Sequence, residues 1–300
     1  VHGMDFINTF LGFHNITRFT TPEHASRVTF WYYFPVIILG MFPWTGILFQ
    51  SIKSSISDSR IDEMRTLMFM HVWWVFVLLF FTICKTKLVS YILPMFPALA
   101  IIIGWNISRM VAKLRYNTTF YSWIVGSGIM FTLLGIGWVI GGQQLPELEF
   151  SGLILGGLTF VLGFAALFTL WYYRDVEMAS WIHVATGATI MVVAFAFMMP
   201  MIEDRFSVKN ISQVYRQECN QSSEIYVDKF LRPGFMYYAG KPGVEMLPKT
   251  DAFAKALRKE EHKYFLVRGL EYRRLLKLQA KPEDLHTISE IGDIYLLEQK

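Results

Sequence analysis

A cationic cluster lies near the start of the chain, ahead of its first long apolar segment. Phe6, Phe10, His14 and Arg18 recur at every fourth position, which places them on one line of a helix. Such a helix could lie in the membrane interface, with His14 and Arg18 directed together toward the lipid headgroups. Periodicity alone is equally compatible with an Arg18 that only extends its side chain to lipid phosphates.

A second cluster, at residues 85–91, holds Lys85, Lys87 and, one turn further along, Tyr91. The two lysines lie in a tight turn between apolar segments, where an ammonium group can bind an anionic headgroup or a phosphate. Lysines at such turns also act as simple interfacial anchors. Together, Arg18 and Lys87 would place two cations on the same side of a membrane, and that arrangement fits a lipid phosphate or pyrophosphate.

The composition identifies the elements that must position these cations. Charged residues make up 17% of the chain and apolar residues 53%, whereas soluble proteins carry about 25% charged residues. About 20 apolar residues span the hydrocarbon layer of a bilayer. We predict six transmembrane segments, of which the first and third contain prolines and should be kinked: 28–49, 66–84, 88–110, 119–141, 152–173 and 180–201.

The loop charges predict the orientation of these spans. Lys53, Arg109 and Arg174 follow the first, third and fifth spans, while the loop at 142–150 has neither Lys nor Arg. By the positive-inside rule the former loops are cytoplasmic, so the N-terminal segment and the C-terminal region lie outside. The turn at 85–87 is then external and carries positive charge against this rule.

The region 202–300 holds much of the charge and alternates strand-like and helix-like pieces. Strands are expected at 224–227, 263–267 and 293–297, and helices from Asp251 to about 261 and over 270–278. The fold class is therefore a mostly α, polytopic helical membrane protein with a small C-terminal α/β domain. We divide the chain into an external juxtamembrane helix (1–27), a transmembrane region (28–201) and an external domain (202–300).

Several classes of function receive no support from these residues. There is no G-x-G-x-x-G sequence and no P-loop, and no basic stripe with interleaved aromatics indicates nucleic acid. Cys84 and Cys219 are too few for a disulfide framework and are expected to be chemically idle. A divalent metal is compatible with the chemistry of a phosphate site, but no residue pattern supports one.

Three motifs carry a resemblance to a known family. The segments at 14–19 (HNITRF), 31–44 (WYYFPVIILGMFPW) and 87–100 (KLVSYILPMFPALA) resemble the protein mannosyltransferase and aminoarabinose transferase group of glycosyltransferases. Val89 stands where that group usually has proline. The resemblance covers the external segment and at least the first three spans, and it extends more loosely to the C-terminal module.

This resemblance implies a bacterial inner-membrane enzyme of the cell envelope with the GT-C fold. Its donor would be a sugar linked to undecaprenyl or a related polyprenyl phosphate, and its acceptor a lipid, such as a lipid A-like molecule, or a protein hydroxyl. By similarity, the donor phosphate would be bound by Arg18, Lys87, Tyr91 and Lys85. His14, Asn15 and His24 would line the same cavity.

The family's general base is an acidic residue in an external loop near the N-terminus of the full protein. No residue of this chain matches that motif, so the catalytic residues are unknown and we expect this polypeptide alone to be inactive. The main alternative is a non-enzymatic protein that binds or transports lipid phosphates. Transport is disfavoured because the predicted spans hold almost no charge. A simple membrane anchor would need one or two spans rather than six.

Overall fold

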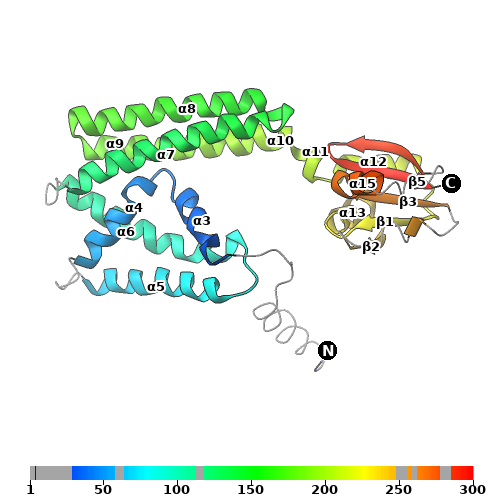
Figure 1. Cartoon of the computed structure of the whole chain (residues 1–300), viewed down its shortest axis with the longest axis horizontal. Coiled ribbons are helices and arrows are strands. Elements are labelled where there is room, and N and C mark those ends of the chain that lie inside the picture. Colours follow the sequence, from blue (N-terminus) through cyan, green and yellow to red (C-terminus); the bar gives the residue numbers. More distant parts are fainter. Residues whose placement is uncertain are drawn as a thin grey trace. The chain divides into compact units, whose positions relative to one another are not determined.

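The structure, a computed structural model, describes residues 4, 29–57, 64–112, 118–247, 256–257, 262–277 and 285–299. The chain divides into two compact units, Val1–Val193 and Ala194–Lys300, which are described separately below. Figure 1 shows the long helices of the first unit and the sheet of the second.

Five helical segments of the structure are long and apolar enough to cross a membrane. They correspond to five of the six predicted spans: Arg65–Ile83, Val89–Val111, Phe120–Gln143, Pro146–Tyr173 and Val176–Met201. The long helices α5 (Met64–Ile83), α7 (Thr118–Gln143) and α8 (Glu149–Phe168) expose large apolar side chains, as lipid-facing helices do. The chain is a multi-pass membrane protein.

The shorter elements of the first unit complete these spans. The span Val89–Val111 begins as a 3-10 helix and continues as an α-helix, and the span Pro146–Tyr173 ends in a π-helical turn. These elements are η2 (Phe30–Tyr32), η3 (Val89–Met95), α6 (Phe96–Val111), η4 (Pro146–Leu148), η5 (Thr169–Tyr173) and α9 (Val176–Val193).

The first predicted span, 28–49, is a broken helix in the structure. It consists of α3 (Tyr33–Gly40) and α4 (Thr45–Ser57), which meet at an angle of 107°. Pro43 lies between them and has no N–H to continue the helical hydrogen-bond ladder. The kink predicted there is confirmed. Pro35 lies in the first turn of α3, where a proline is tolerated.

Close glycine contacts fix the position of α4 against α7. The Cα of Gly46 in α4 would lie 2.7 Å from a Cβ added to Gly126 in α7, and the Gly46 carbonyl oxygen only 2.5 Å from it. Any side chain at Gly126 would therefore force the two helices apart. Small residues that allow such close approach are typical of helix contacts in membranes.

The second unit is an α/β module, as predicted. Its sheet has the order β2-β1-β3-β5-β4, with β1 parallel to β2 and β3, and β5 antiparallel to β3 and β4. The strands are β1 (Glu224–Asp228), β2 (Val244–Met246), β3 (Lys263–Arg268), β4 (Leu285–Ile291) and β5 (Ile294–Gln299). The predicted strands at 224–227, 263–267 and 293–297 are confirmed as β1, β3 and β5.

Both faces of this sheet are covered. Tyr264 and Leu266 of β3 pack in a core with α12 (Lys209–Glu218) and α13 (Arg232–Ala239), whereas Phe265 and Val267 pack on the other face. The predicted helix at 270–278 is confirmed as α15. The predicted helix that begins at Asp251 falls mostly outside the described residues. The helices are η6 (Ala194–Met198), α10 (Met199–Met201), α11 (Glu203–Phe206), α12 (Lys209–Glu218), α13 (Arg232–Ala239) and α15 (Gly269–Lys277).

The α4–α7 contact leads to a prediction about stability. Gly126→Ala should destabilise the protein by about 1–3 kcal/mol, because the new methyl group has no room against Gly46. Gly137→Ala in the same helix is the matched control, since no atom lies within 4 Å of the added Cβ. Thermal unfolding in detergent should separate the two variants. Equal melting temperatures would contradict the close contact.

Candidate functional site

The turn between α5 and η3 holds Lys87 in a defined position. Its side-chain nitrogen, Nζ, donates hydrogen bonds to the backbone oxygens of Thr82 and Cys84, the latter at 3.2 Å. These carbonyls belong to the C-terminal end of α5, where the helix carries partial negative charge and has no further amides to bind. Lys87 therefore caps α5.

An aromatic ring completes the surroundings of Lys87. The ammonium nitrogen lies 5.8 Å from the ring centroid of Tyr33, the first residue of α3. Tyr33 is 1% exposed, whereas the neighbouring Trp31 is 70% exposed. An exposed position such as that of Trp31 is typical of interfacial aromatic residues, whereas Tyr33 is part of the packed interior. Nothing in the spacing of these residues distinguishes the two.

The other members of the predicted second cluster differ in their environment. Tyr91 is half-buried, and its ring centroid lies 5.1 Å from that of Phe81. The Tyr33 hydroxyl is close enough to Tyr91 and Cys84 to interact electrostatically with both. Lys85 is exposed. The structure therefore brings Lys87, Tyr33 and Tyr91 to one place and leaves Lys85 at its edge.

The charge of Lys87 is not balanced by an acid among the described residues. Neither Lys85 nor Lys87 forms an ion pair with a carboxylate in that part of the chain. Burial lowers the pKa of Lys87, because the charged form loses water. A half-buried cation with only neutral partners is a suitable point for an anion to bind.

The first predicted cluster lies outside the described residues. His14, Asn15, Arg18 and His24 all belong to the segment 5–28, so their relation to Lys87 stays a prediction. Within the described residues, no group of three or more His, Cys, Asp or Glu side chains could hold a metal ion.

Comparison with known proteins identifies relatives of this chain. It is 32% identical over 169 residues to the undecaprenyl phosphate-alpha-4-amino-4-deoxy-L-arabinose arabinosyl transferase of Pectobacterium atrosepticum, a match that covers 54% of this chain and 30% of the relative. It is 29% identical over 237 residues to the corresponding transferase 1 of Proteus mirabilis, covering 75% of this chain and 40% of that protein. The chain is a homologue of the aminoarabinose transferases.

The fold agrees with this relationship. The crystal structure of ArnT from Cupriavidus metallidurans bound to undecaprenyl phosphate superposes with a TM-score of 0.66 and 16% identity, over 99% of this chain and 56% of that chain. The structure of the same protein in the apo state gives 0.64. The predicted GT-C type of membrane fold is thereby confirmed. No protein-family profile matches the chain, which spans less than half the length of these two sequence relatives.

Two histidines within the spans, His71 and His183, form hydrogen bonds with residues of the spanning helices. The Nδ1 atom of His71 accepts a hydrogen bond from the Trp74 indole, so the proton on Nε2 can be donated to the Ser55 hydroxyl, 2.8 Å away. His183 is fully buried, and its Nδ1 lies 2.8 Å from the Ala179 carbonyl oxygen. Their hydrogen-bond partners are residues of the helices themselves. The two histidines therefore have a structural explanation within the spans.

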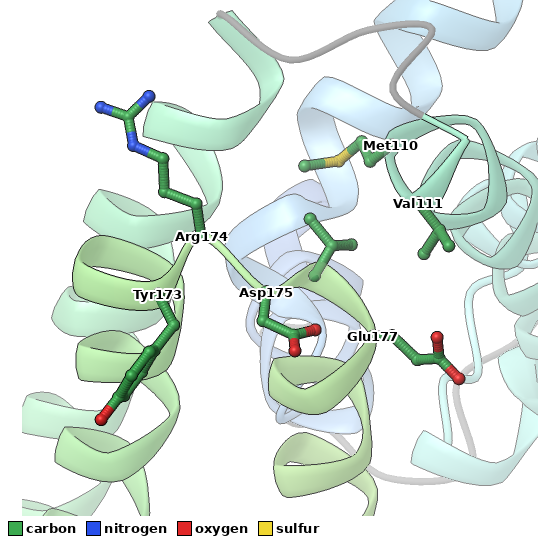
Figure 2. Close-up of a pocket in the computed structure, with 7 residues that line it drawn as sticks. Met110, Val111, Tyr173, Arg174, Asp175 and Glu177 are labelled. Atoms are coloured by element: carbon green, nitrogen blue, oxygen red, sulfur yellow. The ribbon is translucent and has the colours of Figure 1, made fainter.

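A pocket of about 330 Å³ opens at the other end of the span Val89–Val111. Figure 2 shows Asp175 and Glu177 on its wall, with the Arg174 side chain directed away from them. The Asp175 carboxylate accepts a hydrogen bond from the Met178 amide and so caps α9. Two carboxylates disfavour a phosphate, so this pocket does not compete with the turn at Lys87 as a phosphate site.

The capping geometry predicts a stability difference between the two lysines. Lys87→Met should destabilise the apo protein by about 1–2 kcal/mol, because α5 loses two hydrogen bonds at its charged end. Lys85→Met should change stability by less than about 0.5 kcal/mol, since Lys85 is exposed. Thermal unfolding without lipid phosphate tests this. If both variants melt together with the wild type, the cap is energetically irrelevant.

Proposed function

We propose that this chain is part of a membrane glycosyltransferase that takes a sugar from a polyprenyl phosphate and transfers it on the external face of the bacterial inner membrane. The carrier is undecaprenyl phosphate or a close relative. The acceptor is a lipid A-like molecule or a protein hydroxyl. The names of the relatives favour an amino pentose as the sugar and place the protein in the cell envelope.

One observation carries this proposal. Lys87 is a half-buried ammonium group without a carboxylate partner among the described residues, and it lies within the motif that resembles the glycosyltransferase family. Two of its three N–H groups donate to backbone carbonyls, which leaves one for a phosphate oxygen. Arg18 is proposed as the second cation, with Tyr91 beside the phosphate and Lys85 at the entrance. His14, Asn15 and His24 would line the donor cavity.

The chemistry explains why cations matter. When the glycosidic bond to the carrier breaks, negative charge develops on the polyprenyl phosphate that leaves. A fixed ammonium and a guanidinium group stabilise this charge more in the transition state than in the bound donor, which accelerates transfer. The acidic general base is proposed to lie outside the present chain, so that this polypeptide alone would bind a donor without transferring its sugar.

A lipid-phosphate binding or transport protein is the second candidate. It would use the same cations to hold a headgroup but would not break a glycosidic bond. Transporters place ionisable groups near the middle of the membrane. His71 and His183 of the described spans both make hydrogen bonds at their helix contacts. The hydrogen bonding of these histidines favours the glycosyltransferase.

Binding of undecaprenyl phosphate to the complete protein tests the site. Lys87→Ala and Arg18→Ala should each weaken binding by at least about tenfold, because a charge-assisted contact contributes roughly 1.5–3 kcal/mol. Lys53→Ala is the control, since Lys53 is an exposed lysine of α4 in the loop region assigned to the cytoplasm. Unchanged binding in both variants would mean that these cations are interfacial anchors. Sugar transfer with lipid and peptide acceptors then separates an enzyme from a binding protein.

The orientation can be tested by labelling. We propose that the segment 1–27 and the domain 202–300, which flank the transmembrane region 28–201 in the sequence, both lie on the external side of the membrane. The two native cysteines are first removed by Cys84→Ser and Cys219→Ala. A membrane-impermeant maleimide should then label Lys85→Cys in intact cells whose outer envelope has been made permeable to the reagent. Lys53→Cys should react only after the inner membrane is opened. The reverse pattern would overturn the proposed topology.

A further inference from the structure

Tyr33 is a buried aromatic residue with no role in the site as proposed above. It is 1% exposed, and its ring lies below the Lys87 ammonium group at 5.8 Å from the centroid. The ring of Tyr32 contacts it edge-on, with the two ring centroids 5.1 Å apart. No described residue gives the Tyr33 hydroxyl a hydrogen bond of standard geometry. Tyr33 therefore interacts with its neighbours mainly through its ring and less through its hydroxyl group.

We infer that the Tyr33 ring is a positioning element for the donor phosphate, which it serves by holding the Lys87 ammonium group through a cation–π contact. This inference rests on the proposed function, because it assigns Tyr33 to the same phosphate site. Tyr33 itself does not touch the reacting atoms. It acts through Lys87.

The choice of an aromatic ring has a physical reason. A lysine at this turn needs support, since burial disfavours its charged form. A carboxylate would support it but would also neutralise the charge and repel a phosphate. The negative face of an aromatic ring attracts the ammonium group without cancelling its charge. The carbonyls of Thr82 and Cys84 do the same from the end of α5. All three supports are neutral, so the cation stays available to an anion.

The backbone explains how Tyr33 comes to this position. The residue begins α3, directly after the 3-10 turn of η2, while Lys87 lies in the turn between α5 and η3. The contact thus joins the two segments that carry the family-like motifs at 31–44 and 87–100. A ring at this position aligns the entrance of α3 with the turn that holds the cation.

The experiment replaces the ring in the complete protein in lipid nanodiscs and measures binding of undecaprenyl phosphate. Tyr33→Phe should bind within about twofold of wild type, because the hydroxyl has no well-formed partner. Tyr33→Leu should weaken binding roughly fivefold. In the Lys87→Met background, Tyr33→Leu should cause no additional loss, since the ring then has no cation to hold. Sugar transfer should show the same loss mainly in KM.

A graded series guards against a folding defect in Tyr33→Leu. Phenylalanine at position 33 is replaced by its mono-, di- and trifluorinated analogues, which keep the shape of the ring and weaken its negative face. Binding should fall stepwise with fluorination while the melting temperature stays that of Tyr33→Phe. Flat binding across the series, or an equal loss from Tyr33→Leu with and without Lys87, would overturn the inference about Tyr33.

The same measurements separate this inference from the proposed function. If Lys87→Met binds undecaprenyl phosphate as tightly as wild type, the phosphate site itself is wrong. If Lys87→Met loses binding while the fluorinated series is flat, the phosphate site stands and Tyr33 is only a packing residue.

Discussion

A helix that ends in or beside a membrane must find partners for its last backbone carbonyls, because lipid offers none. At the end of α5 the partner is the Lys87 side chain, which donates to the Thr82 and Cys84 oxygens. The site depends on this one interaction. It terminates the helix, sets the turn into η3 and holds an ammonium group at a fixed point at the mouth of the spans. The cation proposed to bind phosphate is thus also a structural cap.

The same constraint shapes the first membrane segment. The chain bends by 107° between α3 and α4, and the freed backbone groups near Pro43 need partners. The Thr45 hydroxyl donates to the Ile38 carbonyl at 2.6 Å, and the Met41 amide binds the Ile37 carbonyl. The bend carries α4 to its glycine contact with α7 and leaves Tyr33, at the start of α3, beside Lys87. A straight helix over these residues could not make both of these contacts.

The parts of the fold that depend on local composition were predictable, and those that depend on contacts between elements were not. Apolar runs of sufficient length predicted six spans, of which five are long apolar helical segments in the described residues, and Pro43 predicted the kink in the sixth. The three predicted strands, β1, β3 and β5, are the three inner strands of the sheet. The edge strands β2 and β4 were missed, since their alternation is weak and half their residues face solvent. Lys87 was singled out by its motif, whereas Tyr33 looks like Trp31 in sequence and differs only in tertiary burial.

In the orientation proposed above, the turn that holds Lys87 departs from the positive-inside rule. A cation on the proposed external side has no general advantage in orienting the protein, so its presence there calls for a local cause. Capping α5 is one cause, but a serine or an amide side chain could donate to carbonyls without a charge to bury. What a neutral cap could not provide is attraction for an anion. The ring of Tyr33 and the carbonyls of α5 stabilise the ammonium group and leave its charge uncancelled. The proposed lipid-linked phosphate would supply the missing negative charge and so offset the energetic cost of burying the ammonium group.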